Sequence, residues 1–115
     1  MSTAATAVMT INSIQAKELS RFRANVALHA SDDQTVRAVA YRPYQGPQSV
    51  TVAADGTVRQ SARPGGSLLG MVDAWALGAL GALASRVREF QVVAQDGRLL
   101  AHSDQGDLVE LNARR

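Results

Sequence analysis

The sequence predicts an α+β fold: a single domain with an antiparallel sheet of about five to six strands and two helices packed mainly on one face. Three observations lead to this prediction. The chain of 115 residues has the usual size of one compact domain. Similar Asp-Gly hairpin signals lie at residues 52–56 and 93–97. Between them, residues 67–88 form an apolar segment of helical length.

We expect the domain to span residues 10–111, with a disordered tail at 1–9 and a flexible basic tail at 112–115. The first nine residues lack the basic region and long apolar stretch of a secretory signal. The chain has no cysteine, which excludes disulfides and thiolate metal sites and fits a reducing compartment. We therefore expect a cytoplasmic protein.

Apolar residues recur at helical spacing near the start of the domain and predict a first helix over residues 11–25. Either Thr10 or Asn12 can cap this helix. Asn12 and Gln15 also have the spacing of a capping box, in which each side chain bonds the other's backbone. Residues 26–30 fit either an extension of the helix or a strand, and the sequence does not decide between them.

The strands are expected where β-branched and alternating residues lie between turn signals. The first hairpin turns at Asp55-Gly56, and its valines at 50, 52 and 58 should face the core. The proline-bounded segment 41–47 should be a loop. The expected strands are 35–41, 49–53, 57–60, 98–102 and 107–111, with a further strand entering the second hairpin.

The segment 67–88 is predicted to be one long helix, with Ser67 as its N-cap and Asp73 as the only ionisable residue from 68 to 84. Because it is apolar on every side, more than one of its faces needs to be covered. Small residues at every fourth position would let another backbone approach closely. The interface residues predicted from this pattern are Gly70, Ala74, Gly78 and Ala82, together with Trp75.

A transmembrane interpretation of this segment is rejected, because its strictly apolar run is short and contains an aspartate. We therefore expect no membrane partner. The order strand-turn-strand, helix, then three strands over roughly residues 48–111 resembles small adaptors of the roadblock and longin type. This resemblance in element order implies a protein that dimerises and scaffolds regulators.

The sequence shows no catalytic constellation, no metal site and no cofactor motif. His29 and His102 are the only histidines, and neither has a second ligand at metal-binding spacing. His102-Ser103-Asp104 has the residue types of a hydrolase triad, but neighbours on a strand point to opposite faces. A weak candidate anion site, Arg63, Gly65, Gly66 and Ser67, lies where the long helix is expected to begin.

Another candidate site is the loop with Tyr41, Arg42 and Tyr44, because tyrosine and arginine are enriched in protein interfaces. The competing interpretation is that Tyr41 closes the core and Tyr44 caps a loop.

The leading functional hypothesis is a small non-enzymatic interaction module, an adaptor or inhibitor, that forms a homodimer through 67–88 and also binds another protein. The net charge of +2 is too small to predict nucleic-acid binding by itself. A nucleic-acid-associated regulator remains an alternative and would use Lys17, Arg21, Arg23 and Arg42. A small enzyme or ligand carrier with a pocket between helix and sheet is the third class.

Overall fold

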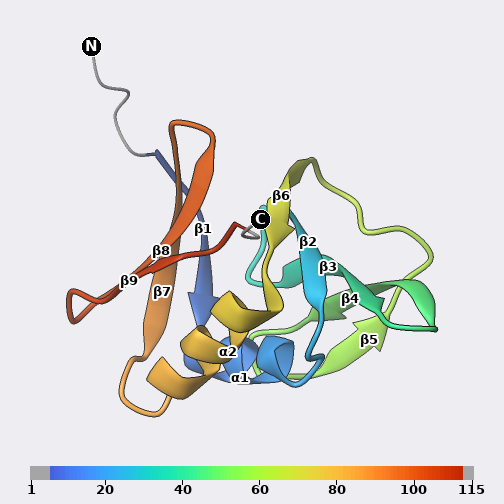
Figure 1. Cartoon of the computed structure of the whole chain (residues 1–115), viewed down its shortest axis with the longest axis horizontal. Helices are drawn as coiled ribbons and strands as arrows, with labels where there is room; N and C mark the ends of the chain where they lie inside the picture. The colour runs from blue at the N-terminus through green and yellow to red at the C-terminus, as the bar shows by residue number, and fades with distance from the viewer. Residues whose placement is uncertain (1–5, 113–115) are drawn as a thin grey trace.

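The computed structural model describes residues 6–112, in which nine strands and two helices form two antiparallel sheets. The four-stranded sheet has the order β1-β7-β8-β9, and the five-stranded sheet has the order β5-β4-β3-β2-β6. Both helices lie side by side at one end of the two sheets (Figure 1). The elements are β1 (Thr6–Asn12), α1 (Ser13–Ser20), β2 (Asn25–His29), β3 (Val36–Arg42), β4 (Gly46–Val52), β5 (Val58–Gln60), β6 (Leu68–Val72), α2 (Ala74–Leu83), β7 (Glu89–Gln95), β8 (Arg98–Ser103) and β9 (Leu108–Glu110).

The predicted single sheet covered by two helices is therefore wrong. Strands make up 47% of the structure and helices 17%, so the protein is mostly β. The element order that resembled roadblock and longin adaptors is present with one added strand, β6, but its strands are divided between two sheets instead of forming one. The physical reason is that β1 pairs with β7, which adds an unexpected strand to the second hairpin and separates it from the first.

The corner between β1 and α1 confirms the capping box. The Asn12 side chain accepts the Gln15 N–H, and the Gln15 side chain accepts the Asn12 N–H. The helix itself is shorter than predicted and covers Ser13–Ser20 rather than residues 11–25. Arg23 has a φ of 51°, which a right-handed helix excludes, and the chain then enters β2. Residues 26–30, left open by the sequence, therefore lie mostly in a strand.

Both predicted tails need correction where the structure describes them. Residues 6–9, expected to be disordered, belong to β1. Asn112, assigned to the flexible basic tail, forms a bridge with Val72 and accepts the Leu99 N–H through its side chain. The rest of the two predicted tails, residues 1–5 and 113–115, lies outside the described residues.

The predicted long helix over 67–88 is a strand followed by a short helix. Residues 68–72 form β6, which pairs with β2, and α2 covers only Ala74–Leu83. Its N-cap is Asp73 rather than Ser67, because the Asp73 carboxylate accepts the Trp75 N–H. The only ionisable residue between positions 68 and 84 thus marks the start of the helix.

The two Asp-Gly hairpins form as predicted, with different turns. Asp96 and Gly97 both have positive φ and make the two-residue turn between β7 and β8. The first turn is longer: Ala53 donates to the Thr57 carbonyl, and only Gly56 has positive φ. The predicted core positions Val50 and Val52 are buried, whereas Val58 is exposed because β5 is a short strand at the sheet edge.

One hydrophobic core joins both sheets and both helices, with Phe90 fully buried. The segment after β9 links the sheets through its backbone. Leu111 donates to the Leu99 carbonyl of β8 and accepts the Asp73 N–H that follows β6. The two sheets pack closely at this junction, where a Cβ on Gly70 would lie 3.1 Å from a methyl group of Leu99.

Replacing Gln15 with alanine should lower the free energy of unfolding by about 3 kcal/mol. The loss follows because the buried Val52 carbonyl and the partly buried backbone groups of Asn12 and Gln34 lose their hydrogen-bond partner. Urea unfolding followed by circular dichroism measures the change. The exposed Gln60→Ala is the matched control and should change stability by less than about 0.5 kcal/mol. Equal effects of the two substitutions would show that the Gln15 contacts contribute little.

Candidate interaction surfaces and the groove between the sheets

The outer face of α2 is apolar and exposed. The helix has the sequence AWALGALGAL and contains no charged side chain. Ala76, Leu77 and Leu80 face the core. Trp75, Gly78 and Ala82 lie on the exposed stripe, which we call the α2 outer face, and the Trp75 side chain is 68% exposed.

Neighbouring elements flank this face on both sides. On one side α1 approaches closely at Gly81, where a Cβ would lie 2.6 Å from the Ser20 hydroxyl. On the other side β9 runs along α2 (Figure 1). It is tied to the helix end by paired hydrogen bonds from the Arg86 guanidinium to Asp107, at 3.0 and 3.2 Å. Leu108 of β9 is 58% exposed, but it pairs with the exposed His102 and therefore lies on the face of the four-stranded sheet opposite to the buried Ala101.

The predicted interface residues are only partly brought together. Ala74, Trp75, Gly78 and Ala82 lie on α2, and the last three share its exposed stripe. Gly70 lies in β6 against Leu99 and does not belong to a continuous ridge with the others.

The loop residues and the basic residues, predicted as separate sites, lie at one end of the five-stranded sheet. The Arg42 guanidinium stacks over the Phe22 ring at 4.8 Å from its centroid. Phe22 lies between Arg21 and Arg23 in the chain, so the contact brings the segment that carries these two arginines to Arg42. Tyr44, at the tip of the β3–β4 hairpin, is fully exposed, and Tyr41 is 44% exposed. The interpretation in which Tyr41 closes the core is therefore wrong.

The structure does not support the candidate anion site at Arg63, Gly65, Gly66 and Ser67. These residues precede a strand, so no helix N-terminus offers free N–H groups there. The glycines have a packing role instead: a Cβ on Gly66 would lie 2.1 Å from the Ala30 carbonyl oxygen. Gly65 likewise lies against the Arg37 guanidinium. Close packing of the β5–β6 connection explains this glycine pair without an anion.

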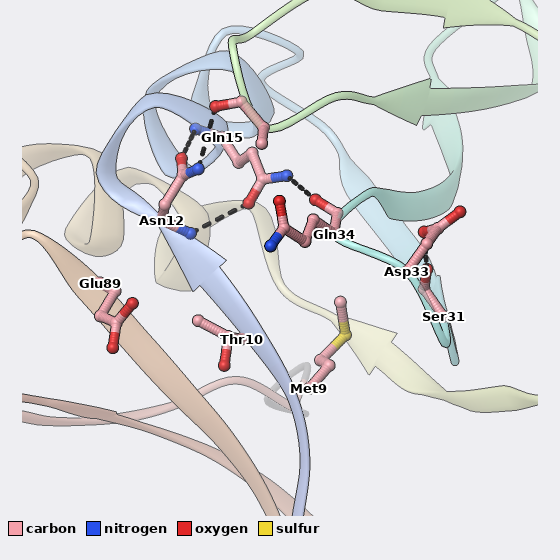
Figure 2. Close-up of a pocket in the computed structure, with 9 residues that line it drawn as sticks. Met9, Thr10, Asn12, Gln15, Ser31, Asp33, Gln34 and Glu89 are labelled. Carbon is pink, nitrogen blue, oxygen red and sulfur yellow. Dashed lines mark hydrogen bonds between the residues drawn. The ribbon is translucent and has the colours of Figure 1, made fainter.

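A groove of about 430 Å³ separates the β1 edge from the β2–β3 connection. Figure 2 shows Thr10 and Glu89 on one side and Ser31 and Asp33 on the other. Its remaining lining residues are Met9, Asn12, Gln15, Gln34 and Ala54. The groove differs from the predicted pocket between helix and sheet, and nothing in the sequence marks it because the pairing of β1 with β7 builds one of its walls.

The groove can hydrogen-bond a polar ligand, but its groups suit acid–base catalysis poorly. Hydrogen bonds from the Ser31 and Thr35 hydroxyls and from the Thr35 N–H, with a smaller contribution from Arg37, hold the pKa of Asp33 well below its usual range. A carboxylate stabilised in this way is a weak base toward the Ser31 hydroxyl. Ser103 instead contacts Asp107, so the triad-like sequence around His102 makes no relay.

Among the described residues, no three His, Cys, Asp or Glu side chains lie close enough to hold a metal ion. No helix in that part of the chain is long and apolar enough to cross a membrane. Comparison with models of protein families, with curated proteins and with solved structures found no significant match to this chain. The surfaces described above are therefore the basis for a functional proposal.

Asp33→Asn should reduce the loss of stability that acid causes. Because the pKa of Asp33 is lowered by folding, its ionised form stabilises the protein above the ordinary value of 3.8, and this stabilisation is lost as the pH falls below it. The thermal midpoint, measured at neutral pH and at several values below 3.8, should change less with pH in the variant. An unchanged acid dependence would contradict this assignment. Asp107, whose pKa is lowered by Arg86 and Ser103, accounts for part of the remaining dependence.

Tyr44→Gly should raise the free energy of unfolding by about 1 kcal/mol. Tyr44 has a φ of 66°, which glycine adopts without a Cβ clash, and its exposed ring contributes no core packing. Urea unfolding measures the effect. The matched control is Tyr41→Gly, which should lower stability because glycine weakens a strand. A loss of stability in Tyr44→Gly would show that the ring makes a stabilising contact.

Proposed function

We propose that the protein is a small non-enzymatic interaction module that forms a homodimer through the α2 outer face. The observation that carries this proposal is a helix without charged side chains whose Trp75, Gly78 and Ala82 lie exposed to solvent. The dimer contact was predicted to involve residues 67–88. Because residues 68–72 form a strand, we now assign it to α2 and its neighbours.

The energetic argument rests on exposed apolar surface. Burying such surface is favourable by roughly 25 cal/mol per Å², and surface helices normally carry polar residues on their outer side. In α2 the outer positions are instead tryptophan, glycine and alanine. A partner that covers them would supply the burial that the described chain leaves incomplete.

A second copy of the chain fits this face, because Gly78 and Ala82 are small and α2 has no charged side chain. Gly78 has open space where a Cβ would be, so the backbone of another helix can approach closely there. A two-fold contact would place Gly78 and Ala82 of both copies together, with Trp75 at the edges. The helix is only ten residues long, so the contact must include elements beside α2 to reach the area of a stable dimer.

Gly78→Glu should weaken self-association by roughly tenfold or more, because it would place a charge in an apolar contact. The glutamate also favours the helix more than glycine does, so the fold should remain intact. Sedimentation equilibrium over a concentration series measures the dissociation constant, and circular dichroism checks the fold.

The matched control is Gln60→Glu, which adds the same charge at an exposed position on the edge strand β5. This control should leave the dissociation constant unchanged. Two results would refute the proposal: a wild-type protein that stays monomeric at every concentration tested, or equal weakening by both variants.

A further inference from the structure

We infer that the end of the five-stranded sheet formed by α1 and the β3–β4 hairpin binds single-stranded nucleic acid. We call this area the basic hairpin surface; its residues are Lys17, Arg21, Arg23, Arg42 and Tyr44. The contact between Arg42 and Phe22 joins two chain segments that are about 20 residues apart in sequence. This surface shares no residue with the α2 outer face, so the inference does not depend on dimer formation.

The charge of this surface favours an anionic partner. Within residues 13–25 and 41–47, four side chains are cationic and Glu18 alone is acidic. Glu18 is paired with Arg21 at 3.3 Å, while Lys17 and Arg23 are exposed. Asp73 reaches the same end of the sheet through the bond from the Ala74 N–H to Asn25, but it is occupied in capping α2.

The exposed aromatic ring points to bases rather than to phosphate alone. Tyr44 is fully exposed at the hairpin tip, and Tyr41 is partly exposed on the strand before it. A tyrosine ring stacks on an unpaired base, and nearby arginines contact the phosphates on either side. The Arg42 guanidinium, already stacked on Phe22, is held in place for such a contact.

The backbone presents these side chains at an energetic cost. Among the described residues, three other than glycine have positive φ: Arg23, Tyr44 and Asp96. Asp96 is explained by its tight hairpin turn, which demands that conformation. Tyr44 is the third residue of a turn that the Gln45 N–H closes onto the Arg42 carbonyl, with Pro43 before it, and such a turn needs a positive φ at this position. Arg23 lies in the turn that ends α1, where a left-handed residue is common. These two turns leave the Tyr44 and Arg23 side chains exposed.

A single strand fits better than a duplex. Paired bases are stacked inside a duplex and are not available to the Tyr44 ring, whereas a single strand offers its base faces. The four cationic side chains of this surface also match the phosphates of a short stretch of nucleic-acid backbone. Three to four phosphate contacts on a single strand give a slope of roughly −2 to −3 for the logarithm of affinity against the logarithm of salt concentration.

The test uses fluorescence anisotropy with a labelled short oligothymidylate and a labelled oligouridylate. We expect saturable binding of at least one probe with the salt slope given above. Tyr44→Ala should weaken it by on the order of tenfold, and Tyr44→Phe, which keeps the ring, should bind like the wild type. Arg23→Gln should weaken binding and reduce the slope by roughly 0.7. Arg59→Gln, on the edge strand β5, is the matched control and should have no effect.

Several outcomes would overturn the inference. These are absence of binding to both probes, equal affinity of Tyr44→Ala and Tyr44→Phe, or binding of poly-aspartate as tight as that of the oligonucleotides. The last result would indicate an acidic protein partner. Tyr44→Gly should lose affinity although we expect it to be more stable, which separates binding from folding. The Gly78→Glu variant should keep full affinity, so failure here and failure of the dimer proposal are distinguishable.

Discussion

The buried amide of Gln15 is the contact on which the arrangement of the two sheets and α1 depends. Its side chain is only 2% exposed and bonds three backbone groups, on Asn12, Gln34 and Val52. These groups belong to the end of β1, the approach to β3 and the end of β4, so one side chain fixes the four-stranded sheet, the helix and the five-stranded sheet together. The Asn12 amide adds a bond to the Ala54 carbonyl. A polar residue is tolerated in this position because each of its bonds is made.

The glycines of α2 show that one sequence pattern serves two different purposes. At Gly81 the missing side chain lets α1 approach, since a Cβ would collide with Ser20. At Gly78, one turn earlier, there is open space instead. A glycine in a helix lowers stability by about 1 kcal/mol relative to alanine. Packing against α1 explains why this cost is accepted at Gly81, whereas no contact within the described residues explains it at Gly78. This difference supports an external contact at Gly78.

Local features could be predicted from the sequence, whereas features that depend on distant pairing could not. The capping box and both Asp-Gly turns are fixed by residues within a few positions of each other, and they formed as expected. Residues 68–72 are apolar and compatible with a helix; they form a strand because the edge of β2, about 40 residues earlier, is available for pairing. The groove and the stacking of Arg42 on Phe22 also follow from pairings between distant segments.

The position of β1 has a consequence for the order in which the protein folds. β2 to β6 pair among themselves within residues 25–72, so the five-stranded sheet can assemble while later residues are still being synthesised. β1 must wait for β7, because Thr6 pairs with Ala94. Closing so long a loop is slow compared with forming a hairpin. β1 is therefore among the last strands to pair. Until β7 is available, the unpaired edges of β1 can bind other chains.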